Sequence, residues 1–161
     1  MKKFTNHIDH VAWISWPVNL NENVARLEQL AGAKLTRFER KELGIIICAN
    51  WEAGLEILSF SEPPTEFNQA LRDWLETHGE GVMSVVFGVR DLEAHEKRLR
   101  QLGVGLGPLL DDHPDSPWHH KLDLRERIAG EVLNTSFVLG DIDYADGVIP
   151  FGDKQRNPTT S

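Results

Sequence analysis

The sequence has very little cysteine, no long apolar run and no excess of positive charge. Its 161 residues include one cysteine, Cys48, which excludes an internal disulfide. No apolar run approaches the roughly 20 residues of a membrane helix, and residues 1–6 lack the apolar segment of a signal peptide. The formal charge of −8 argues against nucleic-acid and membrane partners, because both need clustered Lys and Arg. We therefore expect a cytoplasmic protein.

An alternating stretch over residues 6–15 predicts the first strand. His10 shares one face of this strand with Ile8, Ala12 and Ile14. A histidine in such a place is most often a hydrogen-bonded core residue. Imidazole can also bind a metal ion or transfer protons near neutral pH, so the partners of His10 decide its role.

The first half of the chain reads as one βαβββ unit. A helix with the inward residues Val24, Leu27 and Leu30 ends at Gly32. Glu56 stands in the middle of the last, otherwise apolar strand. Pro63 and Pro64 then break the chain before a connecting helix. The expected strands cover residues 34–42, 44–50 and 53–60, and the connecting helix covers residues 65–78.

The second half repeats the same order of elements. His10 aligns with Ser84, and Glu56 aligns with Glu131, at nearly equal separations along the chain. A turn at Ala129-Gly130 separates the last two expected strands. The fold class is therefore α+β, built from two tandem βαβββ modules in one domain over residues 1–143. The modules cover about residues 6–60 and 81–140, and a polar tail covers residues 144–161. In the second module we expect a helix from Asp91 to Gly103. Its expected strands cover residues 81–89, 104–110, 118–128 and 131–139.

Three motifs occur in the order and spacing of a known family. They are Ile8-Asp9-His10-Val11-Ala12, Gly54-Leu55-Glu56-Ile57-Leu58, and Glu80 to Phe87 followed by Val89-Arg90-Asp91-Leu92-Glu93. Over about residues 6–140 the chain resembles the vicinal oxygen chelate superfamily, which includes glyoxalase I, methylmalonyl-CoA epimerase, extradiol dioxygenases, and fosfomycin- and bleomycin-resistance proteins. The resemblance implies a curved mixed sheet around a pocket, and a homodimer.

The resemblance also implies a divalent metal ion held by the first and last strands of the two modules. Carried over by position, the ligands are His10, Glu56 and Glu131. The fourth position is Ser84, where the metal-dependent members commonly have histidine. An imidazole and two carboxylates suit Fe, Mn, Ni, Co or Zn. His7, His119 and His120 are further candidates near the pocket mouth.

Three functions follow from these residues. The first is a metal-dependent lyase, isomerase, epimerase or dioxygenase acting on an apolar or aromatic molecule with adjacent oxygens, with Glu56 or Glu131 as the catalytic base. The alternative is a metal-free binding protein of the bleomycin-resistance type, which Ser84 favours. The third is a metal-free enzyme that uses His10 with Glu56 or Glu131 as an acid–base pair.

Overall fold

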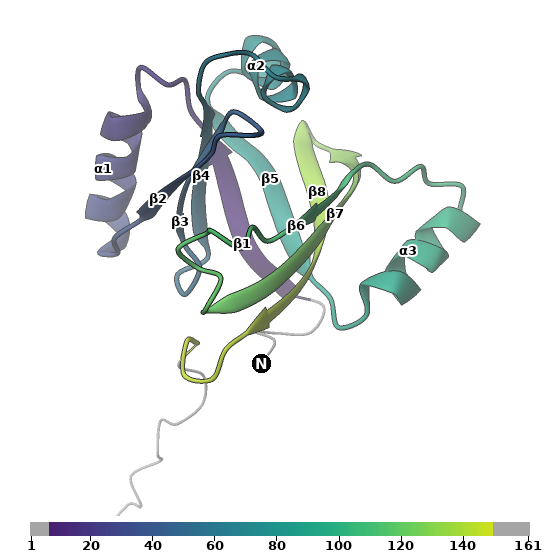
Figure 1. Cartoon of the computed structure of the whole chain (residues 1–161). Coiled ribbons are helices and arrows are strands. Elements are labelled where there is room, and N and C mark those ends of the chain that lie inside the picture. The colour runs from purple at the N-terminus through teal and green to yellow at the C-terminus, as the bar shows by residue number, and fades with distance from the viewer. Residues whose placement is uncertain (1–6, 150–161) are drawn as a thin grey trace, which may run out of the picture.

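Within residues 7–149, eight strands form one curled sheet with three helices outside it (Figure 1). The structure is a computed structural model that describes residues 7–149. The first residue of the expected N-terminal strand and most of the expected polar tail lie outside the described residues. The sheet order is β2-β3-β4-β1-β5-β8-β7-β6. The strands are β1 His7–Ile14, β2 Thr36–Arg40, β3 Ile45–Asn50, β4 Leu55–Phe60, β5 Gly81–Gly88, β6 Leu109–Asp111, β7 Leu122–Val132 and β8 Thr135–Tyr144.

The two βαβββ modules meet at the centre of the sheet. β1 and β5 pair antiparallel, β1 pairs parallel with β4, and β5 pairs parallel with β8. This arrangement confirms the predicted α+β fold with two modules around a curved mixed sheet. No helix among residues 7–149 is both long and apolar enough to cross a membrane.

The helices cover the outer face and one end of the curl (Figure 1). They are α1 Leu20–Ala31, α2 Glu66–His78 and α3 Leu92–Gln101. The sequence marks their ends: Thr65 forms a capping box with Asn68, and Gly32 adopts φ 66° after α1. Leu71 and Leu75 of α2 pack against the core, which leaves the inner face of the sheet to line a cavity.

The hairpin between β7 and β8 differs from the prediction. β7 continues through Gly130 to Val132, and the turn lies at Leu133 and Asn134, which adopt φ of 52° and 56°. At Ala129-Gly130 the chain makes a register shift instead of a turn. Small residues and glycine mark bulges as well as turns, so the sequence pattern placed the end of the strand too early.

Candidate active site

His10 is a buried side chain on the inner face of β1. It is 2% exposed, and its ring stands edge-on to Trp51, with 4.9 Å between ring centroids. His10 Nδ1 lies 3.0 Å from Asp9 Oδ1, and that carboxylate accepts a 2.9 Å hydrogen bond from the Tyr144 hydroxyl. Nδ1 is therefore fixed by the protein, and Nε2 points the other way.

Two carboxylates face His10 Nε2. Glu56 Oε2 lies 3.6 Å away and Glu126 Oε1 lies 3.4 Å away. Glu56 follows from the sheet register, because Ala12 pairs with Glu56 and His10 is the next residue on the same face of β1. Both glutamates are less than 10% exposed. One imidazole thus holds two carboxylates from two different modules.

Sheet curvature brings Glu126 to this place. β7 is the third strand from β1, so a flat sheet would separate them by about 14 Å. The curl closes that separation to a direct contact. Gly140 lies opposite Glu126 on β8, and a Cβ there would come within 2.7 Å of Val86. The strand next to Glu126 therefore carries no side chain at this level.

The buried charges change each other's protonation. Burial alone lowers the pKa of His10, but the hydrogen bond to Asp9, the contact with Glu56 and the charge of Glu126 outweigh burial and raise it to about 10. Burial raises the pKa of Glu126 to about 7; His10 opposes this rise, and Glu56 and Asp9 add to it. His10 is therefore an imidazolium at neutral pH, while Glu126 gains and loses its proton there.

An apolar cavity of about 170 Å³ lies in front of the two carboxylates. This volume is below the roughly 300–1,000 Å³ of typical ligand pockets, so it suits a small molecule. Glu56 and Glu126 line the cavity, whereas His10 lies behind them. Ser84 and Ser136, which pair across β5 and β8, add two hydroxyls to the lining. The apolar lining includes Phe38, Ile47, Trp51, Leu58, Met83, Val86, Trp118, Leu124 and Val138.

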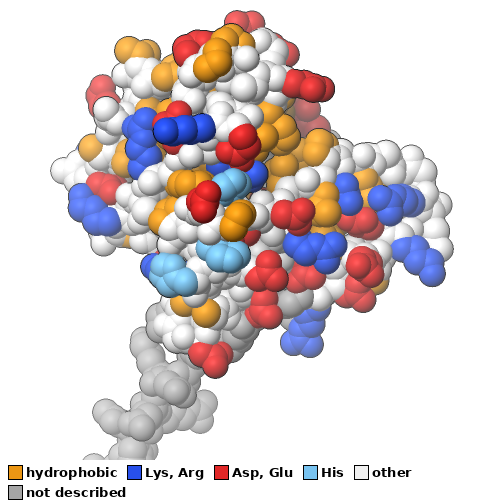
Figure 2. Space-filling view, viewed as in Figure 1, with side chains coloured by type: hydrophobic (Ala, Val, Ile, Leu, Met, Phe, Trp, Pro, Cys, Tyr) orange, Lys and Arg blue, Asp and Glu red, His pale blue; other side chains and the backbone are white. Residues whose placement is uncertain are grey.

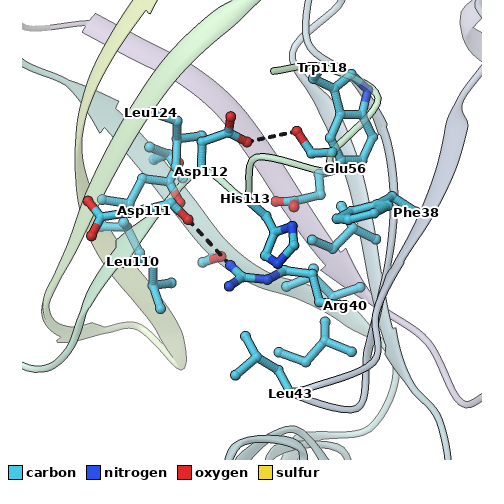
Figure 3. A pocket seen from close by; sticks show the side chains of 18 of the residues that line it. Phe38, Arg40, Leu43, Glu56, Leu110, Asp111, Asp112, His113, Trp118 and Leu124 are labelled. Atoms are coloured by element: carbon cyan, nitrogen blue, oxygen red, sulfur yellow. Dashed lines mark hydrogen bonds between the residues drawn. The ribbon is translucent and has the colours of Figure 1, made fainter. Parts of the chain in front are cut away.

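The segment from Asp111 to Trp118 lies at the mouth of the cavity (Figure 3). Arg40 of β2 donates to the backbone oxygen of Asp111 at 3.3 Å, and Ser116 donates to Asp112 at 2.9 Å. Glu42 lies 3.6 Å from His113 and so adds a further contact between this segment and the first module. Figure 2 shows this side of the molecule, where histidine, acidic and basic side chains gather over apolar ones.

The predicted site residues divide into two groups. His10 and Glu56 lie together as expected. Glu131 does not join them: it is exposed near the end of β7 and does not line the cavity. His119 is paired with Asp112 at 2.6 Å on the surface, and His120 is also exposed. His7 is exposed at the start of β1.

Sequence analysis missed Glu126. The expected turn at Ala129-Gly130 placed Glu131 at the start of the last strand, but that strand is β8. The pairing of Val86 with Val138 repeats the pairing of Ala12 with Glu56, so Val138 is the counterpart of Glu56. A signal for Glu126 was present, because it is the one acidic residue in the alternating row Leu122, Leu124, Glu126 and Ile128.

Comparison with solved structures gives the fold a name. A Streptomyces coelicolor methylmalonyl-CoA epimerase variant in complex with 2-nitronate-propionyl-CoA is 18% identical, with a TM-score of 0.58 over 86% of this chain and 98% of that chain. The methylmalonyl-CoA epimerase from Mycobacterium tuberculosis is 16% identical, with a TM-score of 0.56 over 88% and 92%. A hypothetical protein from Bacillus halodurans reaches 0.60 at 12% identity over 86% and 95%. This chain has the vicinal oxygen chelate fold. No protein-family model and no curated protein matches the sequence.

The residues present do not fit the metal site that the resemblance to vicinal oxygen chelate proteins implies. Of the four positions on the first and last strands of the modules, two carry Ser84 and Val138, which are not suitable ligands. Within residues 7–149, no three His, Cys, Asp or Glu side chains are arranged to hold a metal ion.

Proposed function

We propose that this protein is a metal-free proton-transfer enzyme of the isomerase or epimerase type. The observation that carries the proposal is a buried imidazolium, His10, which holds Glu56 and Glu126 at the floor of an apolar cavity. The pKa of Glu126 near 7 supports this role, because an acid–base group works best when it titrates near the working pH. The methylmalonyl-CoA epimerases of the same fold support the reaction type.

The two carboxyl groups divide the proton transfer between them. The carboxylate of Glu126 removes a proton from a carbon next to a carbonyl group, which leaves an enolate and a protonated carboxyl. Return of this proton to the same face restores the substrate, and its transfer through Glu56 to the opposite face inverts the centre and regenerates both carboxylates. Ser84 and Ser136 line the cavity, and in this proposal their hydroxyls donate hydrogen bonds to the enolate oxygen.

His10 is a positioning residue in this reaction because it does not line the cavity. Its positive charge keeps two carboxylates close together that would otherwise repel each other. The hydrogen bond to Asp9 fixes the ring, and Tyr144 fixes Asp9. Burial and the charge of Asp9 raise the pKa of Tyr144, so its hydroxyl remains a hydrogen-bond donor.

The substrate is a small molecule with an apolar body and a carbonyl group. Apolar side chains form most of the cavity lining, and its volume leaves room for a ring or a short branched chain. A homodimer and a cytoplasmic location remain predictions.

A neutral thioester tests the proposal without requiring any charged group to bind. One enantiomer of the N-acetylcysteamine thioester of 2-phenylpropionate is incubated with the protein in D₂O. We expect racemisation together with deuterium incorporation at the α-carbon, and a loss of about 100-fold or more in Glu126→Gln, as is typical when an acid–base group is removed.

Glu131→Gln is the matched control, because Glu131 is an exposed glutamate on the same strand. It should exchange at the wild-type rate. Equal rates in the wild type and Glu126→Gln would contradict the assignment of the base.

A metal-free binding protein is the second candidate. The observation in its favour is the predominantly apolar cavity, with Ser84 and Val138 at two of the expected ligand positions. Binding of the thioester, followed by quenching of tryptophan fluorescence, without any deuterium incorporation would support this function instead of catalysis.

A further inference from the structure

Aromatic rings line the cavity between its floor and its mouth. Trp51 packs edge-on to Trp118 with 5.6 Å between centroids, and Trp118 packs edge-on to Phe38 at 5.8 Å. Phe38 in turn contacts His113 at the mouth, at 5.9 Å. These rings come from both modules and line the same cavity as Glu56. Figure 3 shows the Glu56 carboxylate pointing into the cavity beside Phe38 and Trp118.

The cavity floor carries an excess of negative charge. Glu56 and Glu126 both line the cavity and both face the Nε2 side of one imidazolium, His10. Because Asp9 already takes the Nδ1 side of the imidazolium, the two glutamates share the charge on the Nε2 side. Burial is the main cause of the raised pKa of Glu126, and the charges of Glu56 and Asp9 add to the rise.

The basic side chains at the cavity wall, Arg40 and His113, contact protein groups at the mouth of the cavity. Arg40 donates from Nε to Glu42 at 2.9 Å and from Nη1 to the backbone of Asp111. His113 also lies against Glu42. No lysine lines the cavity, and the remaining side-chain donors on its described wall are uncharged, namely serine hydroxyls and the indole N–H groups of Trp51 and Trp118. A carboxylate or phosphate inside the cavity would therefore meet carboxylates without a matching cation.

Together, aromatic rings and uncompensated carboxylates favour a positively charged ligand. An ammonium group gains from a charge-assisted hydrogen bond to a carboxylate and from contact with aromatic rings. We propose that the cavity binds a small organic cation, an ammonium group on an aromatic or short aliphatic body, with its charge next to Glu126 and Glu56. The proposal names the substrate class of the proposed enzyme and so rests on the proposed function for its catalytic meaning. A positive charge near the reacting carbon also makes that C–H more acidic, which serves proton removal.

Three probes of similar size and different charge test this inference: 2-phenylethylamine as the cation, 2-phenylethanol as the neutral form and 3-phenylpropionate as the anion. Binding is measured by calorimetry and by tryptophan fluorescence at pH 8, where Glu126 is ionised. We expect the cation to bind about tenfold more tightly than the alcohol, because hydrogen bonds to charged groups contribute more than neutral ones. The anion should bind more weakly than the alcohol.

Glu126→Gln should remove the tenfold preference and leave the affinity for 2-phenylethanol unchanged, while Glu131→Gln should keep the preference. Equal or tighter binding of 3-phenylpropionate, an unchanged preference in Glu126→Gln, or no binding of 2-phenylethylamine would each overturn the inference. Exchange of the neutral thioester without a preference for cations would refute the ligand class and leave the proton-transfer function standing. A preference for cations without exchange of the thioester would refute the proton-transfer function and leave the ligand class standing.

Discussion

The substitution Glu126→Gln should stabilise the protein at pH 8 and have almost no effect at pH 5. Glutamine has nearly the shape of a protonated glutamate. At pH 5 the native protein already holds Glu126 protonated, because burial raises its pKa from 4.5 to about 7. The free energy of unfolding of the variant should then stay within about 0.5 kcal/mol of the wild type.

The pH dependence follows from the proton that Glu126 retains on folding. An acid with a raised native pKa contributes stability below its unfolded pKa, and this stability is lost as the pH rises through the native value. The rise of the pKa from 4.5 to about 7 corresponds to about 3.5 kcal/mol of unfolding free energy, at about 1.4 kcal/mol per pH unit. The wild type loses this amount between pH 4.5 and 7, and the variant does not.

Urea unfolding followed by tryptophan fluorescence at pH 5 and pH 8 measures the difference. The buried Trp51 and Trp118 report on the core around the cavity, and an unchanged dependence on urea concentration shows that the unfolding reaction is the same. Glu131→Gln removes the same charge at an exposed site and should have little effect at either pH. Equal effects of Glu126→Gln at the two pH values would refute the reasoning.

Three further predictions concern the surroundings of the site. Tyr144→Phe should lower the free energy of unfolding by about 1–2 kcal/mol, because the buried Asp9 carboxylate loses a donor; no loss in urea unfolding would contradict this. Arg40→Gln should speed amide hydrogen exchange over residues 111–118, because its contact with the backbone of Asp111 is lost; unchanged exchange would show that other contacts hold the segment. Protein purified without a histidine tag should contain no stoichiometric Fe, Mn, Ni, Co or Zn and show no thermal shift when these ions are added; stoichiometric metal that is lost in His10→Ala would contradict the metal-free site.

The internal repeat predicted much of the fold because each of its strands and helices has a recognisable local sequence pattern. Apolar alternation marks strands, helical spacing marks α1 to α3, and Thr65, Asp91 and Gly32 mark helix ends. His10 and Glu56 were found together for the same reason. Each is a polar residue in an apolar row, and their strands are neighbours in one module.

The rest of the site depends on geometry that local patterns do not contain. Glu126 reaches His10 only because the sheet curls, and its strand is longer than the repeat predicts because Ala129-Gly130 forms a register shift instead of a turn. The contact of Arg40 with Asp111 joins residues 71 positions apart, and neither side chain differs in sequence from an ordinary surface charge.

The curl of the sheet has a consequence for how this site can change. Glu56 belongs to the first module and Glu126 to the second, so the gap between them depends on how tightly the strands between them bend. A substitution at the register shift after Ile128, a few residues along β7 from Glu126, would widen or narrow that gap without replacing either carboxylate. The curvature of the backbone thus sets how strongly the two acids interact. It thereby also sets the pH at which they exchange a proton.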